Sequence, residues 1–405
     1  MLPLNFRYLA IVLSLILFLS VPKPLYPFKH KNPSILTQFL LLSGMSTKKN
    51  IIVGMSGGVD STVAVYLLQQ KGYHVLGVTL QLADHYIKDK SKQSHVIEKA
   101  KAVCDRFGIE HMVVDRMTGF DTCVVKYFAD SYFSGNTPNP CVQCNLLLKW
   151  DSLLKIADEK GIKNIATGHY AKIIKEGKNH CLYKGVDPVK DQSYFLWRLT
   201  SEQLGRTVFP LGDMTKTEIK RIAKELHLPQ SNQSESQDVC FIPENDYKLF
   251  LKQYFPNRMN EVKPGDFVDM EGNIVGKHEG YYRYTIGQRK GLGLAMGEPV
   301  YVREIHPSSN TVMIGKAMDM EDMGCIVSEV NWLDGGDPEG SQDIEVKVRY
   351  RNKGVSARLE PLEHGKYHIM FSEPVFAVTP GQSAVFYKGS KVLGGGVILS
   401  NTQDE

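Results

Sequence analysis

The sequence has few cysteines for its length and little net charge. Seven cysteines, an odd number, are spread over 405 residues, which argues against a secreted disulfide framework and favours a reducing compartment. The 48 basic and 44 acidic residues leave a net charge of +4, and 42% of the residues are hydrophobic. This composition excludes disordered and fibrous classes. The length allows two or three domains with a sizeable core.

The N-terminal segment lacks acidic residues, since none precedes Asp60. Residues 9–21 are almost purely apolar but too few to span a bilayer comfortably, and Pro22-Lys23-Pro24 stands where a signal peptide has small residues. Residues 1–44 are interpreted as an extension upstream of Met45, as an organelle-targeting segment, or as a membrane or export segment. We expect a cytoplasmic protein without a stable membrane partner, with organellar targeting by residues 1–44 as the alternative.

Charge along the chain also limits how it binds a polyanion. Four of the 48 basic residues lie before residue 45, so the rest of the chain has 44 of each sign. Any affinity for a nucleic acid must therefore come from local basic patches.

The first half alternates apolar runs with helical periodicity. Strands are predicted at 51–53, 75–82, 110–114 and 164–167, and helices at 60–71, 94–107, 121–133 and 146–159. This alternation predicts an α/β catalytic domain with a parallel sheet covered by helices on both faces.

The second half changes character. Helices are predicted at 215–226 and 245–254, with a polar, exposed loop at 231–236 between them. After about residue 264, short runs of period 2 predict an all-β C-terminal domain, a small β-barrel. These runs lie at 274–278, 300–305, 311–315, 343–350, 366–371, 383–387 and 392–399.

A loop rich in glycine and serine joins the first strand to the first helix. Its residues are Gly54, Met55, Ser56, Gly57, Gly58, Val59, Asp60 and Ser61. Glycines let the backbone approach an anion, and the free N–H groups and the dipole of the helix face it. The loop contains no lysine, so the Walker pattern is absent, and the dinucleotide fingerprint fails as well. The remaining Ser-Gly-Gly-x-Asp-Ser resembles the signature of ATP pyrophosphatases; a glycine-rich turn without a ligand is the alternative.

Three cysteines stand in unusual contexts. Cys141 and Cys144 lie three apart in a proline-stiffened turn before a helix, where a lowered thiol pKa is expected. No second C-x-x-C and no Cys/His pair accompanies them, so no metal site is predicted. Cys240 follows the polar loop, which could deliver a mobile thiol to a site elsewhere. The alternative is a buried core cysteine beside Phe241 and Ile242.

Two segments suggest RNA binding. Four basic residues share one parity and, on a strand, would point to one face at phosphate-like spacing: Lys347, Arg349, Arg351 and Lys353. Tyr281-Tyr282-Arg283-Tyr284, followed by Arg289-Lys290, interleaves aromatic and basic groups, as in recognition of single-stranded RNA. The alternatives are a solvated edge strand and a β-hairpin with packed tyrosines.

Seven ordered motifs together resemble the tRNA-specific 2-thiouridylases, over about residues 49 to 400. They lie at 56–61, 139–145, 166–170, 190–195, 238–242, 287–293 and 379–382. The resemblance implies a nucleotide-binding catalytic domain, a central tRNA-contacting domain and a C-terminal β-barrel. It implies ATP-dependent thiolation at C2 of the wobble uridine, U34, in tRNAs for Lys, Glu and Gln, with sulfur supplied through a donor relay protein. The expected domains are an extension at 1–48, a catalytic domain at 49–206 to which the 231–244 loop returns, a central domain at 207–298 and a barrel at 299–401.

The resemblance also assigns roles to individual residues. Cys144 matches the nucleophile and Cys240 the cysteine that carries the persulfide, while Cys141 stands where some members have an aspartate. The nucleotide contacts are the loop 54–61, Leu80 and Gly168. The tRNA contacts are Asn139, Pro140, Cys141, His169, Lys190, Asp191, Gln192, Arg349, Tyr350 and Gln382.

The chemistry is consistent with two thiols from separate segments. The C2 carbonyl of uracil is a poor electrophile, so it must first be adenylated. A persulfide then supplies sulfur, and a second thiol resolves it as a disulfide or attacks in its turn. Mg²⁺ would neutralise the departing pyrophosphate, with Asp60 as an indirect helper.

Two other functions compete with this interpretation. Another adenylating ATP pyrophosphatase, acting on a small molecule as argininosuccinate or GMP synthetase does, would leave both cysteines and the basic β-domain without a role. A non-catalytic RNA-binding or adenylate-sensing protein would not need intact thiols at both places.

Overall fold

The structure is a computed structural model that describes residues 49–83, 86, 90–228, 239–242, 246–333 and 340–401, without the side chains of 90–95 and 401. The N-terminal extension and the polar loop at 231–236 lie outside these residues. Residues from Lys49 onward form one compact unit.

The α/β part is built on a parallel sheet in the order β3-β2-β1-β4-β7. Ile51, Ile52 and Val53 of the central strand are fully buried, as expected for a strand covered on both faces. The strands are β1 (Asn50–Gly54), β2 (His74–Gln81), β3 (Glu110–Asp115), β4 (Asn164–Ala166) and β7 (Thr207–Val208).

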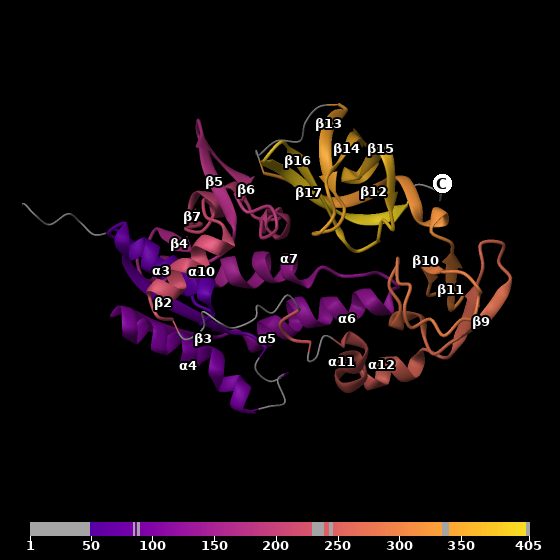
Figure 1. The fold of residues 1–405 in the computed structure, drawn as a ribbon, viewed down its shortest axis with the longest axis horizontal. Helices are drawn as coiled ribbons and strands as arrows, with labels where there is room; N and C mark the ends of the chain where they lie inside the picture. The colour runs from indigo at the N-terminus through magenta and orange to yellow at the C-terminus, as the bar shows by residue number, and fades with distance from the viewer. Residues whose placement is uncertain are drawn as a thin grey trace, which may run out of the picture. The chain divides into compact units, whose positions relative to one another are not determined.

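Helices cover both faces of this sheet (Figure 1). Ile51 and Val53 pack with residues of α3 and α4, whereas Ile52 packs with Trp150 and Leu153 on the opposite face. The helices are α3 (Val59–Gln70), α4 (Lys90–Phe107), α5 (Met117–Phe120), α6 (Lys126–Phe133), α7 (Pro140–Cys144), α8 (Asp151–Glu159), α9 (Ser201–Gly205) and α10 (Lys216–Glu225). The expected α/β fold with a parallel sheet is confirmed.

Two of the helical runs contain π-helical turns. The segment η2 (Asp121–Val125) joins α5 to α6, and η3 (Asn145–Trp150) joins α7 to α8. Such turns inside α-helices are rare and often mark functional sites. The η3 turn follows Cys144 directly, so its geometry determines the direction in which the side chains after this thiol point.

The central part contains α11 and α12 and a small sheet in the order β10-β11-β8-β9. Its elements are α11 (Tyr247–Tyr254), α12 (Pro256–Glu261), β8 (Gly265–Val268), β9 (Ile274–His278), β10 (Tyr301–His306) and β11 (Thr311–Gly315). The strands β10 and β11 thus belong to the central sheet, although they follow the expected boundary at 298. Likewise β7 and α10 follow the expected boundary at 206, yet β7 pairs with β4 and α10 packs on α3.

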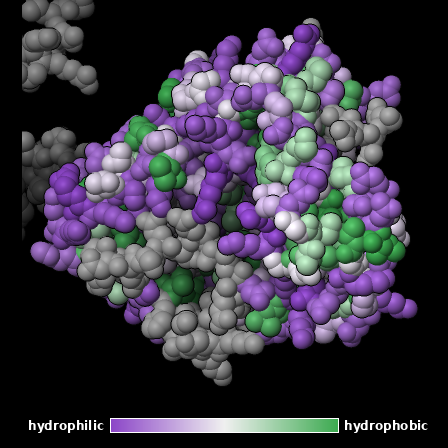
Figure 2. All heavy atoms as spheres, turned by 45° about the vertical axis from the view of Figure 1, so that its right-hand side comes forward, coloured by the Kyte–Doolittle hydropathy of each residue, from purple (hydrophilic) through white to green (hydrophobic). Residues whose placement is uncertain are grey.

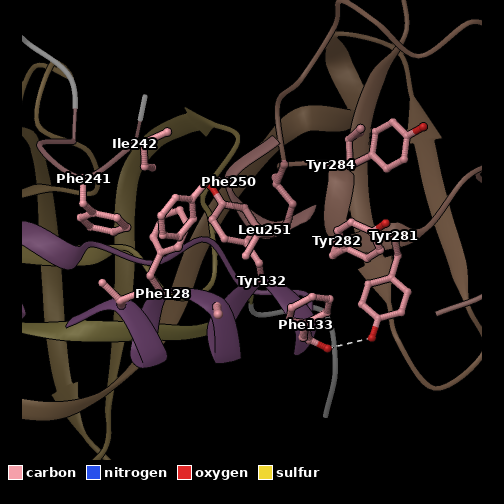
Figure 3. Close-up of a cluster of buried hydrophobic side chains, with 14 of the residues drawn as sticks. Phe128, Tyr132, Phe133, Phe241, Ile242, Phe250, Leu251, Tyr281, Tyr282 and Tyr284 are labelled. Carbon is pink, nitrogen blue, oxygen red and sulfur yellow. Dashed lines mark hydrogen bonds between the residues drawn. The ribbon is translucent and has the colours of Figure 1, made fainter. Parts of the chain in front are cut away.

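An aromatic cluster joins the α/β part to the central part (Figure 3). Phe128, Tyr132 and Phe133 of α6 meet Phe250 and Leu251 of α11. The hydroxyl of Tyr281 donates a hydrogen bond to the carbonyl oxygen of Phe133 at 2.7 Å.

The same cluster decides the role of the tyrosine segment. Tyr281, Tyr282 and Tyr284 are buried in it, and Arg283 is paired with Glu279. The predicted use of these aromatic rings for stacking RNA bases is therefore wrong, because the rings serve the core. They are not in a hairpin, since Tyr281–Arg283 forms a 3₁₀ turn.

The C-terminal part is a closed β-barrel, in agreement with the expectation. Its strands follow the order β12-β15-β14-β13-β16-β17, and β12 also pairs with β17. They are β12 (Glu321–Trp332), β13 (Gln342–Lys347), β14 (Val355–Pro361), β15 (Tyr367–Phe376), β16 (Ser383–Lys388) and β17 (Lys391–Asn401).

A hairpin from the α/β part extends the barrel sheet. It consists of β5 (Ala171–Glu176) and β6 (Asn179–Lys184), and Tyr183 of β6 pairs with Lys391 of β17. The hairpin and the barrel strands lie next to each other in Figure 1. Within the described part of the chain, no helix is long and apolar enough to cross a membrane.

Candidate active site

The glycine-rich loop ends β1 and starts α3. Gly57 has φ +68°, where a residue with a side chain would be strained. The Ser61 hydroxyl lies 3.2 Å from the Ser56 hydroxyl and donates to the carbonyl oxygen of Gly58 at 3.1 Å. Gly58 caps α3 without a side-chain hydrogen bond. The first N–H groups of the helix therefore remain available to an anion.

Loop residues differ in what they can contact. Met55 is 4% exposed and packs in the core between β1, β2 and α4, and its N–H donates to Val78 at 2.8 Å. Its side chain and its backbone N–H are therefore both engaged inside the protein, and neither is available to a nucleotide. Leu80 lies near the C-terminal end of β2, which is parallel to β1. An added Cβ on Gly168 would come within 3.0 Å of the Asp60–Ser61 backbone, so glycine allows the segment after β4 to approach the loop.

A lysine from a distant helix pairs with the loop carboxylate. Lys216, at the start of α10, donates from Nζ to both oxygens of Asp60, at 2.7 and 3.0 Å. The Tyr170 hydroxyl donates to the same carboxylate at 2.7 Å. The loop has no lysine of its own, and a nearly buried lysine 156 residues away in sequence supplies the cation.

Asp60 also lines a cavity of about 840 Å³ between the α/β part and the barrel. Cys141, Asn145, Lys149 and His169 line it as well. The other lining residues are Tyr170, Pro188, Val189, Lys190, Asp191, Gln192, Phe195, Lys347, Tyr350, Arg351, Asn352 and Lys353. Figure 2 shows one face of the molecule, where hydrophilic side chains predominate around a central hollow. A phosphate-loop carboxylate, a thiol and several cations thus share one cavity.

The three candidate thiols lie in one electrostatic neighbourhood. Cys144 is buried, whereas Cys141 and Cys240 are exposed, and all three are free thiols. The charge of Lys149 interacts with each of them. The chain segments that carry the two predicted catalytic cysteines, Cys144 and Cys240, are therefore brought together by the fold.

The expected lowering of the thiol pKa values at the start of α7 is wrong. Desolvation raises the pKa of Cys144 and that of Cys141, and the nearby Lys149 only partly offsets this. The protein atoms packed around Cys240 raise its pKa to about 12, although the residue keeps contact with solvent. Burial therefore outweighs the helix N-terminus, and the resting thiols are protonated at neutral pH.

The residues that follow Cys240 anchor it. Phe241 is 1% exposed, and its ring packs edge-on against Phe120 and Phe128, with centroids 5.4 and 5.2 Å apart. Figure 3 shows the Phe241 ring beside those of Phe128 and Phe250, and Ile242 belongs to the same buried cluster. Cys240 itself is exposed, so the alternative of a buried core cysteine does not hold.

His169 contributes a neutral ring to the cavity. Burial, together with the smaller effect of the charge of Lys149, lowers its pKa to about 3. Its Nδ1 is hydrogen-bonded to the Thr167 hydroxyl at 2.8 Å, and its ring lies 5.5 Å from that of Trp150. This histidine is a hydrogen-bonding group and not a cation at physiological pH.

The segment before the first thiol is held from the barrel side. The Gln382 side chain donates to the carbonyl oxygens of Thr137 and Pro138, at 3.0 Å each. Asn139 and Pro140 are buried. The described geometry gives Gln382 and Asn139 a part in positioning this turn.

The motif at 190–192 forms one wall of the cavity. Gln192 accepts from the Tyr170 N–H at 3.0 Å. Asp191 is buried, and its carboxylate accepts from Gly185 and Ser193. Burial raises the pKa of Asp191, against the effect of these hydrogen bonds. Lys190, Asp191 and Gln192 all line the cavity.

The basic segment after β13 is a turn and not a strand, so the predicted ladder of four cations on one face is wrong. The strand ends at Lys347, and the chain turns. Lys347, Arg351 and Lys353 line the cavity with Tyr350. Arg349 points elsewhere and donates to the carbonyl oxygens of Ile286 and Ala377 and to Thr379.

Sequence reasoning missed two cations of the site. Lys149 follows Asn145 by four residues, and Lys216 lies in a helix that the sequence placed in another domain. Helical spacing places Lys149 on the same face as Asn145, which follows the second thiol, so the sequence contained a signal for Lys149. No local pattern indicates the pairing of Lys216 with Asp60. In the described ranges no cluster of three or more His, Cys, Asp or Glu residues is placed to hold a metal ion.

Three family models of known proteins match the three parts of this chain that the structure shows. Residues 49–244 match the family model described as "tRNA methyl transferase HUP domain", 248–316 the "tRNA methyl transferase PRC-barrel domain" and 322–398 the "Aminomethyltransferase beta-barrel domain". These ranges coincide with the α/β part, the central part and the barrel.

Three bacterial relatives carry the name "tRNA-specific 2-thiouridylase MnmA", the third as "MnmA 1". The one from Clostridium perfringens (strain ATCC 13124) is 42% identical over 362 residues, 87% of this chain and 99% of the relative. The relative from Carboxydothermus hydrogenoformans is 42% identical over 360 residues, 87% of this chain and 98% of its own. That from Caldanaerobacter subterraneus subsp. tengcongensis is 44% identical over 362 residues, with 87% and 99% covered. The chain belongs to the tRNA-specific 2-thiouridylase family.

Proposed function

We propose that this protein is an ATP-dependent sulfurtransferase that replaces the C2 oxygen of U34 in tRNA by sulfur. The observation that carries the proposal is the shared cavity. A carboxylate of the phosphate-binding loop, Asp60, and a thiol, Cys141, line it, and Lys149 of the same lining interacts with the two other thiols, Cys144 and Cys240. An enzyme that adenylates an oxygen and then displaces it with sulfur needs these two groups close to one substrate atom.

In the first step the uridine O2 attacks the α-phosphate of ATP, and pyrophosphate leaves. The uncapped start of α3 and the backbone of Gly57 and Gly58 fit the negative charge of the phosphates. Lys216 balances the charge of Asp60 and adds the cation that the loop lacks. Mg²⁺ bound to ATP would neutralise the pyrophosphate, and Asp60 is the loop carboxylate that would assist it indirectly.

In the second step a sulfur nucleophile attacks C2, and AMP leaves. Cys240 carries the persulfide, whose terminal sulfur forms the bond to C2. The Cys144 thiolate then attacks the Cys240 sulfur, which releases 2-thiouridine and leaves a Cys144–Cys240 disulfide. Two electrons from an external thiol reductant restore both thiols. The exposure of Cys240 supports loading by a sulfur-donor relay protein.

Docking of tRNA uses the basic side of the cavity. The chain as a whole has little excess positive charge, but four basic residues gather at this cavity: Lys190, Lys347, Arg351 and Lys353. The ring of Tyr350 is available for base stacking. Phosphate contacts position an RNA without reading its sequence. The tRNAs for Lys, Glu and Gln are the substrates we propose, on the resemblance of the motifs.

The seven free cysteines support a reducing compartment, and we place the reaction in the cytoplasm.

The test is mass spectrometry of nucleosides in tRNA from cells that lack the protein. We expect 2-thiouridine to disappear from position 34 and to return with a plasmid copy of the gene. Release of AMP from ATP that requires tRNA separates this function from a small-molecule synthetase, and any AMP release separates it from a non-catalytic RNA-binding protein.

A further inference from the structure

Lys149 is placed on the thiol side of the cavity by the π-helical turn η3. It follows Cys144 by five residues, and a turn with i→i+5 hydrogen bonds brings such a pair closer to one face than a regular α-helix does. Its Nζ donates to Oδ1 of Asn145 at 3.1 Å, and Asn145 donates from Nδ2 to the carbonyl oxygen of Phe195 at 3.0 Å. Two hydrogen bonds in series thus fix the ammonium group at the cavity wall.

Lys149 has no carboxylate partner within 4 Å among the residues that the structure describes. The two acidic residues that line the same cavity are engaged elsewhere. Asp60 pairs with Lys216, and Asp191 accepts from the loop that it stabilises. An ammonium group held inside a protein normally has an anionic partner. The described groups that interact with Lys149 are therefore the candidates for that partner when they ionise in the reaction.

Those groups are three thiols and one neutral ring. Cys141 and Cys144 come from α7, Cys240 from the 239–242 segment, and His169 from the segment after β4. The pKa of His169, about 3, excludes a positive charge on this ring near neutral pH. Lys149 is therefore the cation through which the three sulfur atoms interact with positive charge.

We propose that Lys149 holds the reacting sulfur atoms as anions, as the counter-cation of the Cys144 thiolate and of the persulfide on Cys240. This role rests on the proposed thiolation reaction. Lys149 forms no covalent bond and gives up no proton. It acts through the thiols as a positioning and charge-stabilising residue, and Asn145 sets the direction of its ammonium group.

The shifts in the pKa of Lys149 and in the pKa values of the three thiols agree with this geometry. Burial alone would lower the pKa of Lys149, but its interactions with Cys144, Cys141 and Cys240 outweigh burial and raise it. In return, Lys149 lowers the pKa of each of the three thiols, against the larger effect of desolvation. Without the ammonium group, desolvation would act on the thiols unopposed and disfavour their nucleophilic form.

The test compares Lys149→Met and Lys149→Arg with a matched control on the same helical run. Lys155→Met removes a lysine that is exposed and paired with Asp151 on the surface, so it should behave as the unchanged protein. The first readout is the alkylation rate of Cys144 and Cys240 by iodoacetamide between pH 6 and 10, followed by peptide mass spectrometry. The second is formation of AMP and 2-thiouridine with tRNA, ATP and a persulfide donor.

We expect alkylation at a given pH to be about tenfold slower in Lys149→Met, equivalent to a rise of about one unit in the thiol pKa. Thiouridine formation should fall at least in proportion, while AMP formation stays within about twofold. Lys149→Arg should keep the alkylation rate at each pH and most of the thiolation, since its charge is retained.

An unchanged alkylation profile in Lys149→Met would overturn the proposal, whether or not thiolation is lost, because a purely structural role would not move that profile. So would loss of thiolation in Lys149→Arg equal to that in Lys149→Met. Alkylation does not require tRNA, so failure of the unchanged protein to make thiouridine would instead contradict the proposed function.

Discussion

The phosphate loop and the thiol cluster each contribute one residue, Asp60 and Cys141, to the lining of one cavity but are built in opposite ways. The loop is a single contiguous segment, residues 54–61, whose shape follows from one strand-to-helix junction and its own hydrogen bonds. The thiols come from α7 and from the 239–242 segment, about a hundred residues later, which is fixed by Phe241 in the aromatic cluster. Local sequence therefore determines the first region, and tertiary packing determines the second. Substitutions should separate the two half-reactions along the same line.

Replacing the sulfur carrier should have the largest effect. Cys240→Ser removes the thiol that accepts the persulfide, so we expect no detectable 2-thiouridine and no transfer of ³⁵S from a donor. Adenylation needs only the loop and a docked uridine, so AMP-tRNA should still form. Radiolabel transfer measures loading of the protein with ³⁵S, and nucleoside mass spectrometry of the same sample measures 2-thiouridine.

The other two thiols provide the controls for this experiment. Cys144→Ser should also make no thiouridine, yet Cys240 should still accept persulfide sulfur. Cys141→Ser should keep most of the activity. A competent Cys240→Ser enzyme would rule out the two-thiol mechanism. An inactive Cys141→Ser protein beside an active Cys144→Ser protein would reverse the assignment of the nucleophile.

Removing the loop carboxylate should affect only the first half-reaction. Asp60→Asn keeps the size of the side chain but removes the carboxylate charge that pairs with Lys216 at 2.7 Å. We expect AMP formation to fall by roughly 100-fold, as for the loss of one preorganised electrostatic group. The affinity for tRNA, measured by filter binding, should change little because docking lies elsewhere. Parallel loss of both would mean that the loop and the RNA surface are not separable.

The pH dependence should also differ between the two regions. Desolvation raises the pKa of Cys144, so the thiol is mainly protonated at pH 7 and its thiolate fraction grows as the pH rises. Single-turnover sulfur transfer to adenylated tRNA should therefore accelerate between pH 7 and 9, by up to about tenfold per unit. Neutral His169, with a pKa of about 3, adds no titration in this range. A sulfur-transfer rate that is flat from pH 7 to 9 would contradict the protonated resting state.

Replacing a single basic residue of the 350–353 turn should have the smallest effect of these substitutions, and it should act on tRNA binding. Lys353→Ala should weaken tRNA binding a few-fold and reduce the slope of log K against log salt by about 1. Arg358→Ala, an exposed arginine of β14 outside the cavity, is the matched control and should leave the slope unchanged. Equal slopes for the two variants would place the tRNA phosphates away from the 350–353 turn.

The sequence alone predicts the α/β sheet well because its strands are short buried runs between helical periods. The strands β1, β2, β3 and β4 match their predicted ranges within about two residues. The hairpin β5–β6 escaped prediction because Lys172 and Lys175 interrupt the apolar pattern of β5, which is a strand through its antiparallel pairing with β6. The long strand β12 was missed for a similar reason, since it carries two register shifts against β17.

The candidate site is predictable to the extent that it is local. The loop and the C-x-x-C turn follow from spacing, but the directions of single side chains do not. Arg349 has the same parity as Lys347 and Arg351, yet the chain turns after β13 and sends its guanidinium to the 377–379 segment. Lowered thiol pKa values were expected from a helix N-terminus, and desolvation by distant segments reversed them.

The most direct test of the account is the stoichiometry of the two products in one reaction. Purified protein, unmodified tRNA, ATP and a persulfide donor are mixed, and AMP and 2-thiouridine at position 34 are quantified over time. The account predicts that both appear in equal amounts and that AMP release requires the tRNA. AMP that accumulates without thiouridine, or thiouridine that forms without ATP, would contradict a single cavity that couples adenylation to sulfur transfer.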